Sequence, residues 1–395
     1  MSWIEQVLSA TDESESPLRF YYWGGLTALS AVVRKNVYLD RFYYKLYPNI
    51  YTLFVAKSGL RKGSPVTLTR SLIEEVKCTR VVLGRSSMPQ IIKDLSKAYS
   101  TEDGKVIKDA HGFIVSGELA AFFVKDPDAL TILTDLYDTH AYEKEWRNAL
   151  KGTGTDHLKS PCITLLGATN EDHFSEAIPP NAVGGGFIAR TFLIFEDKRR
   201  GINPLLTAPA NLVTIKDLAA HLHDVAKVVG RFRLATPAEH LFDKWYRDFC
   251  TQDHNDPTGT LERVHDGILK VSMLLSLAED ADLIIHKKHL EESIEECLRC
   301  TGGMKQVTMG QGKSSLALAT KLVLQELIRR PDHRIDRQKV LQKFWGQFDA
   351  FDLDRIAETL EGAGAITIQK AGKQTVYALK SSTLEQYTKY KAEVN

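Results

Sequence analysis

The segment that most constrains the fold is a short apolar run followed by a small, polar loop and a helical pattern. Residues 50–56 (Ile-Tyr-Thr-Leu-Phe-Val-Ala) have the length and the β-forming residues of a buried strand. Residues 57–64 are mostly small or polar, and residues 67–76 have the pattern of a helix. With Lys62 near the end of the loop, this layout predicts a phosphate-binding loop. Backbone N–H groups and the helix N-terminus attract phosphates there, and the lysine neutralises charge on the β- and γ-phosphates.

The loop departs from the usual Gly-x-x-x-x-Gly-Lys-Ser/Thr pattern. Ala56 and Arg61 replace the two glycines, and Gly63 stands where a hydroxyl for Mg²⁺ is expected. A looser form, with glycine three residues before Lys62, is satisfied, and the hydroxyl then falls to Ser64. The alternative is a Gly/Ser turn between a strand and a helix. The candidate nucleotide-binding residues, with Ser64 as the metal ligand, are Ser58, Gly59, Arg61, Lys62, Gly63 and Ser64.

A second polar site follows another apolar strand. Residues 111–119 (His-Gly-Phe-Ile-Val-Ser-Gly-Glu-Leu) end in small residues and one acid, Glu118. A carboxylate at a strand tip beside the loop can polarise an attacking water, so Glu118 is the candidate for that role. The alternative is an acid that interacts with the dipole of a helix at residues 119–123. The aspartate that would hold Mg²⁺ through water is replaced by Gly117.

Two further strands end or begin with candidate residues. Residues 162–170 form an apolar strand, and Thr169 or Asn170 would face a γ-phosphate if this strand neighbours that of Glu118. A plain strand cap is the alternative. Residues 184–195 give a glycine-rich loop, Arg190 and a final strand. An arginine at this place can reach the γ-phosphate of a neighbouring subunit, or it can pair with an acid of its own subunit.

Composition limits the class of protein. The chain has 395 residues, 43% of them hydrophobic and 26% charged, with a net charge of +1, which predicts two or three domains with ample core. Any nucleic-acid contact must come from local patches, since the overall charge is near zero. Five scattered cysteines indicate a reducing cytoplasm. The Cys297–Cys300 pair lies in a helical pattern, which favours a buried helix face over a metal or redox site. No signal peptide or membrane-spanning run is expected.

Breaks in the pattern predict five parts. They are an N-terminal helical segment (1–47), an α/β core (48–200), a helical subdomain (201–305), a linker (306–315) and a winged-helix domain (316–395). In the last part, the third predicted helix (352–361) is acidic, which argues against insertion into the DNA major groove. Lys370 and Lys373 on the wing are the more plausible DNA contacts, and protein binding is the alternative.

A basic stretch lies between residues 139 and 159. Lys144, Arg147 and Lys151 accompany Trp146 there, and a basic loop with an aromatic residue can follow the backbone of single-stranded DNA. A solvated surface loop is the alternative.

Several of these motifs occur in one order: residues 15–17, 46–50, 61–64, 116–119, 136–137 and 184–190. The set resembles the ATPase domain of phage and mobile-element replication proteins, a RecA/AAA+-like group of P-loop NTPases often fused or partnered to primases. The likeness covers about residues 10–305. It implies a helicase that forms a hexameric ring, hydrolyses ATP with Mg²⁺ between subunits and translocates on single-stranded or forked DNA.

Carried over from this resemblance, each candidate has a role. Lys62 binds phosphate, Ser64 assists Mg²⁺, Glu118 activates water, Asn170 senses the nucleotide and Arg190 acts in a neighbouring site. A second class is a nucleotide-responsive DNA-binding initiator, loader or regulator without unwinding activity, which the residues at 117 and 352–361 favour. A third class is a structural scaffold whose loop no longer binds nucleotide.

Overall fold

The computed structural model describes the chain in two compact units, Met1–Met304 and Lys305–Asn395. The first unit includes the N-terminal helices, a parallel sheet and the helices of residues 201–304. The sequence predicted these as three separate parts. The description leaves out residues 84–86, 101–103, 105, 120–121, 124–127, 151–153, 172, 175–185, 206–212, 253, 255, 257, 309–315, 372–373 and 386–395.

The first unit is built on a five-stranded parallel sheet. In spatial order its strands are β11 (Thr191–Phe195), β3 (Tyr51–Val55), β10 (Cys162–Thr169), β7 (His111–Ser116) and β4 (Arg80–Leu83). The sheet and the helices around it make this unit a mixed α/β structure, as expected. Because all five strands are parallel, the residues that follow β3, β10 and β7 meet at one edge of the sheet, with β10 in the middle.

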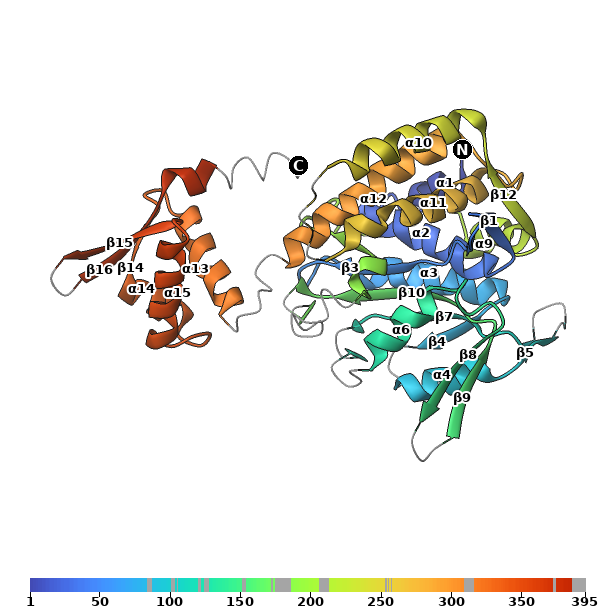
Figure 1. Cartoon of the computed structure of the whole chain (residues 1–395), viewed down its shortest axis with the longest axis horizontal. Helices are drawn as coiled ribbons and strands as arrows, with labels where there is room; N and C mark the ends of the chain where they lie inside the picture. The colour runs from blue at the N-terminus through green and yellow to red at the C-terminus, as the bar shows by residue number, and fades with distance from the viewer. Residues whose placement is uncertain are drawn as a thin grey trace. The chain divides into compact units, whose positions relative to one another are not determined.

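Helices cover both faces of this sheet (Figure 1). Successive side chains of β3 point to opposite faces. The hydroxyl of Thr52 lies 2.8 Å from that of Thr27 on one face, and the hydroxyl of Tyr51 donates to the carbonyl of Leu133 at 2.9 Å on the other. The first face is covered by α2 (Leu18–Val33) and α3 (Gly63–Val76), and the second by α4 (Met88–Ser96) and α6 (Ala129–Tyr137).

Helix α2 is the centre of the core. It is apolar all round and almost wholly buried, as expected of a helix enclosed on every side. The sheet lies on one side of it, and the helices α1 (Trp3–Ala10), α9 (Ile215–Val225) and α11 (Thr260–Glu279) pack around the rest. Residues 20–23, whose aromatic side chains could have stacked on bases, are buried in this core instead.

The remaining elements of the first unit flank this centre. A second sheet has the order β13 (Ile284–Ile285), β12 (Gly230–Leu234), β1 (Val37–Asp40) and β2 (Lys45–Leu46), and its β1–β2 pair is a hairpin that precedes β3. Two hairpins, β5–β6 and β8–β9, form separate two-stranded sheets outside the main sheet. The other bounds are β5 (Tyr99–Ser100), β6 (Val106–Ile107), β8 (Glu145–Leu150), β9 (Gly154–Lys159), η1 (Ile188–Arg190), α10 (Thr236–Cys250) and α12 (Lys287–Thr308).

The second unit has a small core of its own. Three helices pack on a three-stranded antiparallel sheet of order β14-β16-β15. The three helices and the β15–β16 hairpin were predicted from the sequence. Strand β14 was missed, because three residues with one apolar side chain give no strand signal. The bounds are α13 (Ala317–Arg329), β14 (Arg334–Asp336), α14 (Arg337–Phe344), α15 (Ala350–Gly362), β15 (Ile366–Ala371) and β16 (Gln374–Leu379).

We expect Gly24→Ala to destabilise the first unit, because α2 and α3 approach closely at this glycine. A Cβ atom at position 24 would lie 2.5 Å from Oγ1 of Thr69, a hydroxyl fixed by its hydrogen bond to the Pro65 carbonyl. Overpacking of this kind lowers the free energy of unfolding by about 1–3 kcal/mol. Gly302→Ala in α12 is the matched control. Its Cβ would meet nothing within 4 Å, so it should stabilise by about 0.5–1 kcal/mol. Denaturant unfolding that ranks the two variants the other way would contradict this packing.

Candidate functional site

The candidate site is the loop of residues 56–62, here called the Lys62 loop, at the carboxyl edge of the main sheet. The Nζ atom of Lys62 donates to the carbonyl oxygens of Ala56 at 2.7 Å and Lys57 at 3.1 Å. It also donates to Oδ1 of Asn170, the residue that follows β10, at 2.7 Å. The ammonium group thus closes its own loop and joins the end of β3 to the end of β10.

Helix α3 starts directly after this loop, and no side chain caps its first turn. The partial positive charge of such an N-terminus attracts anions. Gly63 opens the helix, and among the described residues a Cβ atom there would meet nothing within 4 Å, so there is open space at this position. The loop therefore presents an ammonium group and an uncapped helix end on the same short segment.

Arg61 holds the loop to the N-terminal part of the chain. It has a φ of +54°, a left-handed conformation that glycine adopts most easily, at the position where the usual motif has glycine. Its Nε atom donates to Oε2 of Glu15 at 2.5 Å, and the Asn203 N–H donates to the other oxygen at 2.9 Å. The Asn203 N–H and then the Arg61 guanidinium hold the pKa of Glu15 below its usual value. Arg61 thus has an anchoring partner in the chain.

The other predicted residues of the site are exposed. Ser58, Gly59 and Ser64 lie at the surface, and Gly59 has a φ of +89°. The Ser64 hydroxyl lies near the hydroxyl of Tyr21 on α2, whose pKa burial raises and which hydrogen-bonds to the Ser14 hydroxyl at 2.8 Å.

Glu118 lies at the same edge of the sheet as Lys62. It is an exposed residue, the second after β7, and β7 is separated from β3 only by β10. Two strand spacings put the ends of β3 and β7 about 10 Å apart. Burial lowers the pKa of Lys62, and the nearby Glu118 carboxylate counteracts this effect. Lys62, Asn170 and Glu118 therefore form a row across the tips of three adjacent strands, and Gly117 adds no carboxylate beside them.

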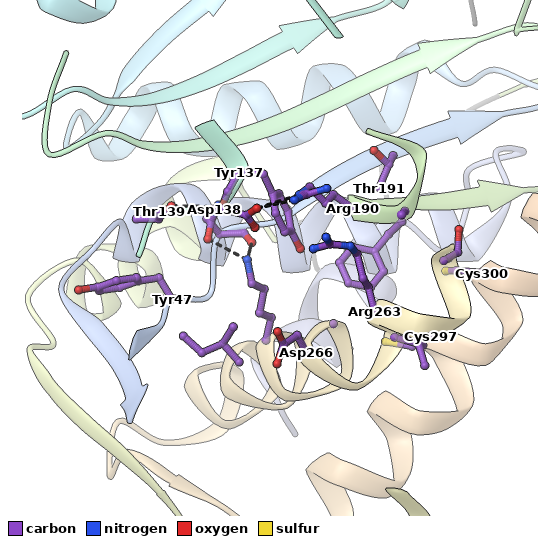
Figure 2. A pocket seen from close by; sticks show the side chains of 18 of the residues that line it. Tyr47, Tyr137, Asp138, Thr139, Arg190, Thr191, Arg263, Asp266, Cys297 and Cys300 are labelled. Carbon is purple, nitrogen blue, oxygen red and sulfur yellow. Dashed lines mark hydrogen bonds and ion pairs between the residues drawn. The ribbon is translucent and has the colours of Figure 1, made fainter. Parts of the chain in front are cut away.

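Arg190 lies at the opposite edge of the sheet. It directly precedes β11, whose first residue pairs with the first residue of β3. Its guanidinium forms an ion pair with Asp138 and donates to the Gly186 carbonyl at 3.1 Å, and the side chain is only 10% exposed (Figure 2). An arginine finger must present a free guanidinium to a neighbouring phosphate. The structure thus favours the ion pair within the chain, which the sequence left open, over the arginine finger.

Arg190 lines a small cavity of about 60 Å³ that sequence reasoning missed. Lys270 of α11 lines the same cavity and is 4% exposed. Its Nζ atom donates to the carbonyl and side-chain oxygens of Asn49, both at 2.9 Å, and lies 3.8 Å from the centre of the Tyr137 ring. The signal that could have found it was one lysine inside the apolar run of residues 268–278.

The predicted DNA contacts are dispersed. Residues 145–150 and 154–159 pair as strands β8 and β9, and Trp146 is buried, so it cannot stack on bases. Lys144 is exposed, whereas Arg147 pairs with Glu145 at 2.8 Å. In the second unit, Lys370 lines a cleft with Arg337 and four acids, Asp336, Asp354, Glu358 and Glu361. Lys151 and Lys373 lie outside the described residues.

We expect the stability of the protein to rise with pH between about 8 and 10.4 through Lys270. Burial lowers its pKa to about 8, against about 10.4 for an unfolded lysine. The unfolded chain therefore binds more protons than the folded chain in this range. The free energy of unfolding should rise by about 3 kcal/mol between these two pH values. Lys270→Met should remove this rise, whereas the exposed Lys216→Met on α9 should keep it. Denaturant unfolding across this pH range measures both, and equal slopes for the two variants would contradict the assignment.

Comparison with protein-family models and with curated proteins finds no match to this chain. Within the described residues, no helix is long and apolar enough to cross a membrane, and no group of three or more acidic, histidine or cysteine side chains is placed to hold a metal ion. Cys297 and Cys300 are buried free thiols on α12. Any functional inference therefore rests on the row formed by Lys62, Asn170 and Glu118.

Proposed function

We propose that the chain is a P-loop ATPase whose Lys62 loop binds the phosphates of ATP, and that it acts as a DNA motor in replication. The observation that carries this proposal is the row of Lys62, Asn170 and Glu118 at the carboxyl ends of three adjacent parallel strands. In open α/β sheets, ligands bind at this edge. A cation, a polar amide and a carboxylate, placed in that order, suit a triphosphate and the water that attacks it.

Lys62 would change partners on binding. Its ammonium group is held by three neutral oxygens, and a phosphate oxygen carries charge, so the phosphate makes the stronger hydrogen bond. The uncapped end of α3 and the free space at Gly63 would receive the remaining phosphate oxygens. Asn170 would lose its bond to Lys62 at the same time, which makes it a suitable sensor of bound nucleotide.

Glu118 would act on the attacking water. In hydrolysis the water oxygen forms a bond to the γ-phosphorus, the bridging bond to the β-phosphate breaks, and ADP and phosphate leave. A carboxylate about two strand spacings from the lysine accepts a hydrogen bond from that water without touching the phosphate. The proton released in the reaction passes to phosphate or solvent.

Mg²⁺ bound with ATP would neutralise charge on the β- and γ-phosphates. Such an ion is held mainly by phosphate oxygens and water, with one or two protein ligands. The exposed Ser64 hydroxyl in the first turn of α3 would be one such ligand, and Gly117 supplies no carboxylate.

The second unit supports a role in replication complexes. Its order of helix, strand, two helices and a hairpin is that of a winged helix. The cleft that contains Lys370 has more acids than bases, which favours a basic protein partner, such as another replication protein, over DNA at this surface. Assembly into a ring, movement on single-stranded DNA and a primase partner follow from the resemblance and remain part of the proposal.

A nucleotide-responsive DNA-binding regulator without unwinding activity is the second candidate. It is favoured by the engagement of Arg190 with Asp138, which leaves no free guanidinium at that position to complete a neighbouring site. A forked DNA substrate distinguishes the two candidates, since a motor separates its strands during hydrolysis and a regulator does not.

We expect Lys62→Ala to abolish ATP hydrolysis and to weaken ATP binding by at least about tenfold, because a charge-assisted bond to phosphate is lost. Lys57→Ala is the matched control. This exposed lysine is in the same loop and contributes only its backbone carbonyl to the Lys62 contacts, so the variant should bind and hydrolyse ATP normally. Calorimetry and phosphate release measure both properties. Parental turnover in a folded Lys62→Ala variant would remove this residue from the site.

Glu118→Gln should separate binding from hydrolysis. The amide keeps the size of the side chain but is a much weaker base, so turnover should fall by about 10²–10⁴-fold while ATP still binds. Glu74→Gln, at an exposed position on α3, should leave both properties unchanged. If Glu118→Gln turned over ATP at the parental rate, the carboxylate would have only the helix-dipole role that the sequence also allowed.

A further inference from the structure

A second polar cleft lies at the amino edge of the main sheet, at the other end of the strands from the Lys62 loop. It has a volume of about 680 Å³, and we call it the amino-edge cleft. His111, the first residue of β7, and Arg34, the residue after α2, both line it. The other charged residues of its lining are Lys108, Lys159, Lys227 and Asp109, so basic side chains outnumber the acid.

Two side chains in this lining have buried nitrogen atoms without partners among the described residues. His111 is 6% exposed, and neither of its ring nitrogens has a hydrogen-bond partner in the part of the chain that the structure describes. The Nε atom of Arg34 also lacks one, although the two other guanidinium nitrogens donate to the carbonyls of Cys78 and Ala226, each at 3.2 Å. Buried polar groups normally have partners, and leaving them unpaired lowers stability.

The charges around His111 and Arg34 indicate which kind of ligand would fit there. Burial, followed by the charges of Arg34, Lys35 and Arg80, lowers the pKa of His111 to about 3, so the ring is neutral at physiological pH. A neutral imidazole still carries one N–H donor. Together with the Nε–H of Arg34, the site offers two donors in a positive environment, where a cation would be repelled and an anion attracted.

We propose that the amino-edge cleft binds a phosphate group through Arg34 and His111, either as a free phosphate compound or as part of a nucleic-acid backbone. A phosphate supplies several acceptor oxygens and accepts strong, charge-assisted bonds from a guanidinium. Lys159 and Lys108 at the same cleft add attraction of longer range, although Lys159 also pairs with Asp109 at 3.4 Å. This inference does not depend on ATP binding at the Lys62 loop, which lies at the opposite edge.

The test uses the full chain with Lys62→Ala, so that phosphate bound at the Lys62 loop does not contribute. Its histidine side chains are labelled with ¹⁵N, and the resonances of His111 are assigned by their absence from His111→Leu and from His111→Gln. The two probes are inorganic phosphate and a short oligothymidylate, each added at constant ionic strength. The resonances of His111 and the melting temperature are followed during each titration.

We expect the His111 resonances to shift and the melting temperature to rise with at least one probe. His111→Leu removes the unpartnered ring nitrogens, so it should fold at least as stably without the probe but bind it about tenfold or more weakly. His240→Leu, at an exposed position on α10, is the control and should respond like the parent.

The two arms identify the source of the phosphate. A response to oligothymidylate at concentrations where inorganic phosphate has no effect supports a nucleic-acid backbone, and a comparable response to both supports a free phosphate compound. If neither probe moves the His111 resonances, or if His111→Leu keeps the full response, the proposal is overturned. These outcomes do not depend on whether the Lys62→Ala variant still binds ATP.

Discussion

The arrangement of the candidate site depends on one interaction, the hydrogen bonds of the Lys62 ammonium group to three oxygens. Two of them belong to the loop itself and the third is on Asn170, so one cation fixes the shape of the loop and connects β3 to β10. The group is only partly buried, and Glu118 supplies negative charge nearby. A lysine held by neutral oxygens in this way is not locked in place, because a phosphate oxygen is a stronger acceptor than any of them.

The N-terminal part of the chain has a direct role in this site. Glu15 accepts hydrogen bonds from Arg61 and from the backbone of Asn203. It lies just before α2, the buried helix on which the sheet and the surrounding helices pack. The loop is therefore anchored to the segment that leads into the core, which explains why an arginine can occupy a left-handed position that glycine would fill more easily.

The sequence predicted the strands of the main sheet well, because a parallel strand buried on both faces is a continuous apolar run. It also located Glu118 and Asn170, since the polar residue that ends such a run is conspicuous. It could not assign the partner of Arg190 or the burial of Trp146, because these contacts join residues far apart in the chain. The cavity at Lys270 and the unpartnered nitrogens of His111 could not be predicted for the same reason. Each depends on side chains from separate elements, so no local sequence pattern indicates it.

The polar groups at the amino edge of the main sheet are compensated to different degrees. Arg190 is paired with Asp138 and Lys270 is bonded to Asn49, so these cations are already satisfied within the fold. The Nε atom of Arg34 and the ring nitrogens of His111, at the same edge, have no partner among the described residues. A fold that provides partners for Arg190 and Lys270 gains nothing from leaving these donors unpaired, unless a group from outside the chain binds them. This contrast is a stronger reason to look for a ligand there than the size of the cleft, since a cleft without unmet hydrogen-bonding groups needs only water to fill it.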